Sequence, residues 1–261
     1  MHAPQNTLGT SGLVAGRLGF SGGYGAPAAA FEMAFERGCN YFYHGSVRRP
    51  GMNQAIKNIA AKGQREKLII AAQTYMRAPW LMRWSMNRFF KKTGLEYADV
   101  LLLGWWNGMP PQSIIDAALE MKHKGLVRHI AISGHERPAF VDFAKAGHFD
   151  IFHVRYSAAH RGAEKEVFDA IPQGERPGIV TYTATRWGGL ISPRKMPAGE
   201  KTPRASDCYR FVLTNPAVNV CMTGPRNMAE TEEALAALDR GPMQADEMAW
   251  MRRIGDHLRV K

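Results

Sequence analysis

Cysteine is scarce in this sequence, and its few copies are scattered. The 261 residues contain three cysteines and no CxxC pair: Cys39, Cys208 and Cys221. An odd, widely spaced set is typical neither of a disulfide framework nor of a cysteine-based zinc site. His135, His153 and His160 have no carboxylate or cysteine at ligand spacing, so they are interpreted as structural histidines. We therefore expect free thiols and no metal.

Long apolar runs, linkers and nucleic-acid motifs are missing as well. No apolar run approaches the roughly 18 residues that a membrane helix needs, and no Ser/Gly-rich or like-charged stretch marks a linker. The opening residues MHAPQNTLGTSG lack the charged and apolar regions of a signal peptide. Known nucleic-acid motifs are absent. We expect a cytoplasmic protein with a small-molecule substrate and no nucleic-acid or membrane partner, and a homo-oligomer stays open.

Acidic residues are outnumbered by basic ones. The chain has 34 Lys and Arg against 23 Asp and Glu, which gives a formal net charge of +11. The basic residues are dispersed along the chain and form no dense tract. A surface of this kind attracts anions. A nucleotide or an acidic metabolite is therefore a favoured ligand class.

What the sequence does contain is an alternation of short apolar runs with longer amphipathic segments. Eight runs are continuously apolar, as strands buried on both faces should be: 17–20, 40–43, 68–74, 99–103, 127–133, 150–156, 178–182 and 218–223. Helix-like segments follow at 27–37, 52–62, 79–92, 112–123, 138–146, 163–171, 205–214, 228–238 and 245–257. Eight βα units in one series predict an α/β fold, a (β/α)8 TIM barrel formed by a single domain over 1–261. An open dinucleotide-binding sheet is the alternative, but GFSGGYGAP lacks the GxGxxG spacing.

Polar residues at the carboxyl ends of the strands are the first candidates for a site, because a barrel keeps its active site there. The second predicted strand runs into the turn YHGSVRR, which contains Tyr43, His44 and Arg48. A phenol can donate a proton, and an imidazole titrates near neutral pH. Arg48 is a candidate anion ligand. The alternative is that Tyr43 and His44 only fill the mouth of the barrel.

Several segments, in chain order, carry a family resemblance: ERGCNYFYHGS, YADVLLLGWW, KHKGLVRHIAISG, VTYTATRWGGL and MTGPRNMAETEEA. They resemble motifs of the aldo-keto reductase superfamily, for example E-x-G-x-N-x-F-D-T-A for the first and G-K-x-R-x-I-G-V-S-N for the third. The likeness covers nearly the whole chain. It implies a barrel whose bottom is capped by a short N-terminal β-hairpin, here NTLGTSGLVAGRLGFSGGYG. It also implies reduction of a carbonyl by a nicotinamide hydride.

The resemblance also implies an unusual active site. The family's polar residues are Asp, Tyr, Lys and His, and by motif position they fall on Tyr43, Arg48, Gln73 and Gly104. All four positions are substituted. Arg48 stays charged and cannot act as a proton donor in the way a phenol beside a lysine does. Together with the turn described above, this makes Tyr43, His44, Arg48 and Gln73 the candidate catalytic residues, and Tyr43 or His44 is the nearest replacement donor.

The positions that hold the cofactor in the family are better retained. By motif position, Ser133 would hold the nicotinamide carboxamide, and Tyr182 would stack on the nicotinamide ring. Arg226 would face the adenosine 2′-phosphate, and Glu233 would lie near adenine. Arg186 begins a long basic loop that would run along the pyrophosphate. The resemblance therefore implies NADP(H) as the cofactor.

Three functions remain open from the sequence. The first is an NADP(H)-linked oxidoreductase of aldo-keto reductase type with a non-standard active site. The second is a nucleotide-binding pseudoenzyme, and the third is a redox-neutral lyase or isomerase that acts on an anionic substrate. The retained cofactor positions favour the first two, and the lost tetrad favours the last two. We take the first as the leading hypothesis; the substrate and the direction of the reaction are not determined by the sequence.

Overall fold

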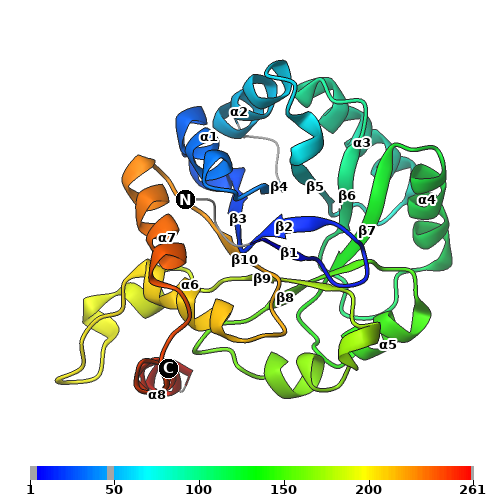
Figure 1. The fold of residues 1–261 in the computed structure, drawn as a ribbon. Coiled ribbons are helices and arrows are strands. Elements are labelled where there is room, and N and C mark those ends of the chain that lie inside the picture. The colour runs from blue at the N-terminus through cyan, green and yellow to red at the C-terminus, as the bar shows by residue number, and fades with distance from the viewer. Residues whose placement is uncertain (1–4, 46–49, 260–261) are drawn as a thin grey trace.

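Eight parallel strands close into a barrel in the computed structural model, which describes residues 5–45 and 50–259 (Figure 1). The strands follow one another around the ring in chain order, and β10 pairs with β3 to close it. They are β3 (Leu18–Ser21), β4 (Tyr41–His44), β5 (Ile69–Thr74), β6 (Ala98–Leu103), β7 (Val127–Ser133), β8 (Ile151–Arg155), β9 (Gly178–Tyr182) and β10 (Val220–Thr223). The predicted α/β barrel is confirmed.

Helices surround the barrel and cover the outer faces of its strands (Figure 1). They are α1 (Ala28–Glu36), α2 (Pro50–Ala61), α3 (Pro79–Thr93), α4 (Gln112–His123), α5 (Ala139–Ala146), α6 (Ala205–Thr214), α7 (Met228–Arg240) and α8 (Ala245–Arg259). The helix predicted over 163–171 is confirmed only in part, because a short π-helix forms over Glu164–Phe168. Its last hydrogen bond joins the N–H of Asp169 to the carbonyl of Glu164 at 2.9 Å. Pro172 comes four residues after Phe168 and disfavours helical backbone at Ile171.

The N-terminal hairpin caps one end of the barrel, as the resemblance implied. Strands β1 (Gln5–Thr7) and β2 (Val14–Gly16) pair in antiparallel fashion and cross the centre of the barrel in Figure 1. The loop between them inserts the fully buried Leu8 into the interior cluster of the barrel. Gly9 has a left-handed φ of 55°, and a Cβ there would lie 2.2 Å from the backbone nitrogen of Gly178. Glycine is therefore required where the hairpin meets the amino end of β9.

The alternation of side chains along each strand separates two apolar clusters. Tyr41 belongs to the cluster inside the barrel, and Tyr43 packs against the same cluster. Phe42, between them, belongs to the larger cluster between strands and helices. Inward-facing residues at the carboxyl ends of the strands are therefore the ones that can reach a site at the mouth of the barrel.

The cysteines, the helices and the metal-binding side chains bear on three further expectations. The three cysteines are buried and unpaired, so the prediction of free thiols is confirmed. Within the described ranges, no helix is long and apolar enough to cross a membrane. No group of three or more His, Cys, Asp or Glu side chains placed to hold a metal occurs in that part of the chain either.

Asn40 joins the hairpin to the barrel. Its Oδ1 accepts a hydrogen bond from the N–H of Gly16 at 2.9 Å. Its Nδ2 donates to the carbonyls of Val14 and Lys67, each at 3.0 Å. The side chain is buried, so water cannot replace these bonds when it is removed.

We predict that Asn40→Ala lowers the free energy of unfolding by about 1–3 kcal/mol, because it leaves buried backbone groups without partners. Urea denaturation followed by circular dichroism measures the loss. The matched control is Asn58→Ala, whose side chain bonds to Glu32 and Gln54 on the helix surface. Equal losses in the two variants would show that the buried hydrogen bonds of Asn40 contribute no more to stability than those of a side chain on the helix surface.

Candidate active site

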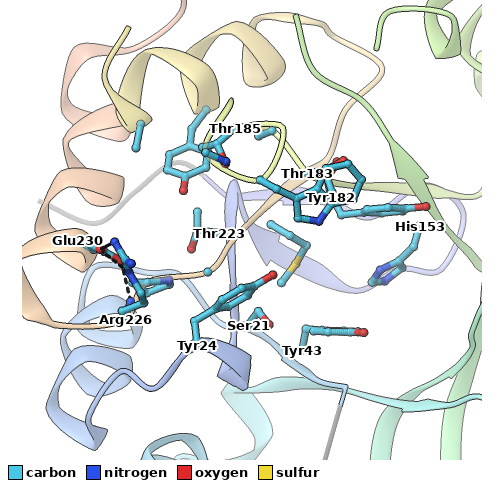
Figure 2. A pocket seen from close by; sticks show the side chains of 18 of the residues that line it. Ser21, Tyr24, Tyr43, His153, Tyr182, Thr183, Thr185, Thr223, Arg226 and Glu230 are labelled. Carbon is cyan, nitrogen blue, oxygen red and sulfur yellow. Dashed lines mark hydrogen bonds and ion pairs between the residues drawn. The ribbon is translucent and has the colours of Figure 1, made fainter. Parts of the chain in front are cut away.

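A cavity of about 900 Å³ opens at the carboxyl ends of the barrel strands (Figure 2). Most of the residues that the sequence singled out line it: Tyr43, Gln73, Ser133, Tyr182, Arg226 and Glu233. Figure 2 shows Tyr43, His153 and Tyr182 around one part of the cavity, and Arg226 with Glu230 at another. The size is at the upper end of the range for small-molecule sites, which suits a large ligand.

The remaining predicted residues lie elsewhere. Arg48 falls outside the described residues. Arg186 has a left-handed φ of 52° and is absent from the cavity wall; its charge instead acts on His160.

His44 faces the opposite side of β4 from Tyr43. Its Nε2 lies 2.8 Å from Oδ1 of Asn53 on α2. Its ring packs edge-on against Phe89 of α3, with 5.0 Å between the ring centroids. Neighbouring residues of a strand point to opposite faces, so Tyr43 and His44 cannot both enter the barrel. Of the two candidate proton donors, only Tyr43 reaches the cavity.

Tyr43 and Gln73 form a direct pair in the cavity wall. The hydroxyl of Tyr43 donates to Oε1 of Gln73. A Cβ placed on Gly104 would lie 2.4 Å from Nε2 of Gln73 and 2.8 Å from ring atoms of Tyr75. The space beside Gly104 is therefore filled by those two side chains. A larger side chain at position 104 would fit only if Gln73 and Tyr75 both moved.

Tyr41 and His153 form a second pair, which sequence reasoning missed. The hydroxyl of Tyr41 lies 2.8 Å from Nε2 of His153, and both side chains are buried inside the barrel. Burial lowers the pKa of His153 to about 3, so the imidazole is neutral at physiological pH. Burial likewise raises the pKa of the Tyr41 phenol, which keeps its proton. The two-residue spacing from Tyr43 was the signal in the sequence, because it turns both phenols inward.

The pairing selects a tautomer of His153. In the described part of the chain the Tyr41 hydroxyl makes a hydrogen bond to His153 and to no other side chain, and a buried hydroxyl proton without an acceptor is costly. Tyr41 therefore donates to Nε2 of His153, and Nδ1 carries the ring proton. Because His153 lines the cavity, its Nδ1–H is the donor it offers to a ligand.

Ser133 and Tyr182 are held in place by the chain around them. The Ser133 Oγ accepts from the backbone N–H of Trp105 at 3.0 Å, which leaves its own proton to donate. The Tyr182 hydroxyl donates to the carbonyl of Gly134 at 3.2 Å and so fixes the ring at the cavity wall. A Cβ at Gly134 would lie 2.0 Å from the carbonyl oxygen of Trp106. Only glycine fits there, where the resembling family has asparagine.

The charged residues at the other side of the cavity are already paired. Nη2 of Arg226 lies 2.6 Å from Oε1 of Glu230, and its Nε lies 2.8 Å from the same oxygen. This hydrogen-bonded guanidinium lowers the pKa of Glu230. Glu233 accepts from the N–H of Ser206 at 3.1 Å and forms an ion pair with Arg204. Any phosphate near Arg226 must therefore compete with, or share, the carboxylate of Glu230.

Comparisons with known proteins agree with this architecture. The model of a family described as "Aldo/keto reductase family" matches residues 26–206. The chain is similar in structure to the holo form of the aldo-keto reductase AKR11C1 from Bacillus halodurans, with a TM-score of 0.79 and 19% identity over 97% of this chain and 96% of that one. For the apo form of that protein the TM-score is 0.76 and the identity 21%, with the same coverage. No curated protein matches the sequence significantly.

We predict that Tyr41→Phe releases His153 into a mixture of tautomers, because Nε2 then loses its donor. Nitrogen-15 NMR of histidine-labelled protein reports which ring nitrogen carries the proton. The unaltered protein should show Nδ1 protonated. Tyr97→Phe is the control, since that phenol donates to Glu66 and does not touch His153. Observation of a protonated Nε2 in the unaltered protein would reverse the assignment.

Proposed function

Because the chain belongs to the aldo/keto reductase family, we propose that it is an NADP(H)-linked oxidoreductase that acts on a carbonyl compound or its alcohol through a non-standard set of polar residues. One observation carries the proposal: Ser133, Tyr182, Arg226 and Glu233, far apart in the chain, line one cavity together with Tyr43. The cavity lies at the carboxyl ends of the strands, where barrel enzymes hold their substrates.

The residues present fit a nicotinamide dinucleotide. Ser133 keeps a proton with which its hydroxyl can donate to the carboxamide, because its oxygen already accepts from Trp105. Tyr182 offers a ring pinned at its hydroxyl, a surface suited to stacking. Arg226 is exposed and can meet a 2′-phosphate. When bound, NADPH supplies a hydride to a carbonyl carbon; the protein must supply the proton.

Tyr43 is the proton donor that we propose. In the structure its hydroxyl donates to Oε1 of Gln73. A half-turn of the Gln73 amide reverses this bond, since Nε2 then donates to the phenolic oxygen, and the phenol can donate its proton to a substrate oxygen. Gln73 is neutral, so no cation from that position assists the loss of the proton. Nδ1–H of His153 provides a second donor in the same part of the cavity.

A nucleotide-binding protein without turnover is the second candidate function. The observation that favours it is the packing of Gln73 and Tyr75 beside Gly104, which fills the space that a further polar side chain at that position would occupy. A redox-neutral lyase or isomerase is the third. Titration of the purified protein with NADPH, followed by nicotinamide fluorescence, separates the first two candidates from the third.

We predict that the protein binds NADPH more tightly than NADH, and that Arg226→Ala erases the difference. A charge-assisted bond from Arg226 to the 2′-phosphate is worth about 1.5–3 kcal/mol. Glu230→Gln should raise NADPH affinity, because it removes the anion that already pairs with Arg226. Fluorescence titration with both cofactors measures these effects. Arg253→Ala, which breaks a surface pair with Glu200, is the control. Equal affinity for the two cofactors in the unaltered protein would refute the prediction.

We predict that simple aldehydes are reduced about 10²–10⁴-fold more slowly than by a complete Asp-Tyr-Lys-His set, the usual contribution of general acid catalysis. Tyr43→Phe should lower kcat further and leave substrate binding largely intact, because it removes the proposed proton donor. His44→Ala should affect stability more than kcat, since His44 packs against Asn53 and Phe89. Steady-state kinetics and thermal melts measure the two effects. Turnover at ordinary rates, or turnover unaffected by Tyr43→Phe, would overturn this role.

A further inference from the structure

Arg155 stands out among the arginines near the cavity. It ends β8, where the alternation that turns Ile151 and His153 inward turns Arg155 the same way. Its Cα is paired with that of Tyr182 on β9. Its Nε is buried without a hydrogen-bond partner, and within the described residues no carboxylate pairs with its guanidinium. Arg155 is thus a half-buried cation without an acidic partner; it is next to Tyr182 of the cavity wall, although it is not itself part of that wall.

Three other arginines of similar burial do have acidic partners: Arg65 with Asp99, Arg137 with Glu166, and Arg161 with Asp256. The Nε of Arg65 and that of Arg137 are unpartnered too, so the missing carboxylate is what distinguishes Arg155 from them. A cation withdrawn from water is costly unless it is paired. Two residues beyond Arg155, the Oγ of Ser157 is also buried without a partner. The end of β8 therefore has two buried polar atoms without a partner in the described chain, which makes it a place where an external ligand could be bound.

The surroundings of Arg155 are positively charged. Burial, followed by the charges of Arg155, Arg186, Arg137 and Arg259, lowers the pKa of His160 to about 4. Burial and Arg155 also lower the pKa of His135, against a smaller opposing effect of Glu136. The carboxylate of Glu166 forms an ion pair with Arg137 and so does not neutralise Arg155. His135 and Tyr182 line the cavity, and the charge of Arg155 acts to lower the pKa of both. The positive potential of Arg155 therefore extends to the cavity wall.

We propose that Arg155 is the centre of an anion subsite beside the active-site cavity, and that it binds the carboxylate or phosphate of an anionic carbonyl substrate. The subsite names the substrate class of the proposed reductase, so as a substrate site it rests on the proposed function. The planar guanidinium can donate two parallel hydrogen bonds to either oxyanion. Trp105, exposed in the cavity wall with its ring 5.7 Å from that of His135, offers apolar surface for the carbon chain between anion and carbonyl.

Direct binding tests the subsite without any turnover. The full-length protein, with and without saturating NADPH, is titrated with succinate and separately with inorganic phosphate at constant ionic strength. NMR of labelled histidines follows His160. Binding of an anion should raise the pKa of His160, because it offsets the positive charge around that ring. Arg155→Gln should abolish the response to both anions. Arg88→Gln, an exposed arginine stacked on Trp84 of α3, is the matched control and should keep it.

Paired substrates then test the assignment to the substrate. Succinic semialdehyde and butanal differ in a terminal carboxylate, and glyceraldehyde 3-phosphate and glyceraldehyde differ in a phosphate. In one of the two pairs, the anionic aldehyde should have a lower KM than its neutral partner. The pair that shows this difference identifies the bound anion as a carboxylate or a phosphate. Arg155→Gln should raise that KM about tenfold or more, as expected for the loss of a charge-assisted bidentate contact. The neutral member should be unaffected.

The outcomes separate this inference from the proposed function. Anion binding lost in Arg155→Gln, in a protein that fails to bind NADPH, would refute the reductase and leave the subsite standing. An unchanged His160 in the presence of both anions, or an unchanged response in Arg155→Gln, would overturn the subsite whatever the cofactor does. Loss of succinate and phosphate binding on saturation with NADPH would assign Arg155 to the cofactor and overturn its role toward the substrate.

Discussion

The site depends on one geometric constraint, the alternation of side chains along eight parallel strands that close on themselves. In each strand every second residue faces the interior, and closure brings the last inward residues together at one end. Tyr43, Gln73, Ser133, His153 and Tyr182 are neighbours for this reason, although they come from five different strands. The hairpin caps the amino end of the barrel with Leu8, so the carboxyl end is the one that holds a large cavity.

Polar groups that point into such an interior must find partners, since little water reaches them. Tyr41 pairs with His153, Tyr43 with Gln73, and Tyr182 with the carbonyl of Gly134. These pairs hold the rings at defined positions and set which protons are available to a ligand. Arg155 has no such partner in the described part of the chain, and its Nε is buried.

Two glycines shape the lining of the cavity. At Gly104 the missing side chain makes room for Gln73 and Tyr75, and at Gly134 it makes room for the carbonyl of Trp106. A side chain at position 104 would require those two side chains to move, whereas one at position 134 would meet backbone atoms. The polar lining is therefore packed around these two glycines.

The sequence by itself determined the barrel, most of its strands and helices, and the family, because hydrophobic periodicity and local motifs are properties of short segments. Strand limits agree with the predicted ones within about two residues. The helix predicted over 163–171 is shorter and of π type, over Glu164–Phe168, because the hydrophobic pattern does not distinguish π from α backbone. Only the tertiary structure decided that His44 points outward, that Arg186 lies near His160 outside the cavity wall, and that Glu230 already engages Arg226. It also brought Tyr41 to His153 across 112 residues of chain. Such contacts depend on which strand ends meet when the barrel closes, and no local segment of the sequence carries that information.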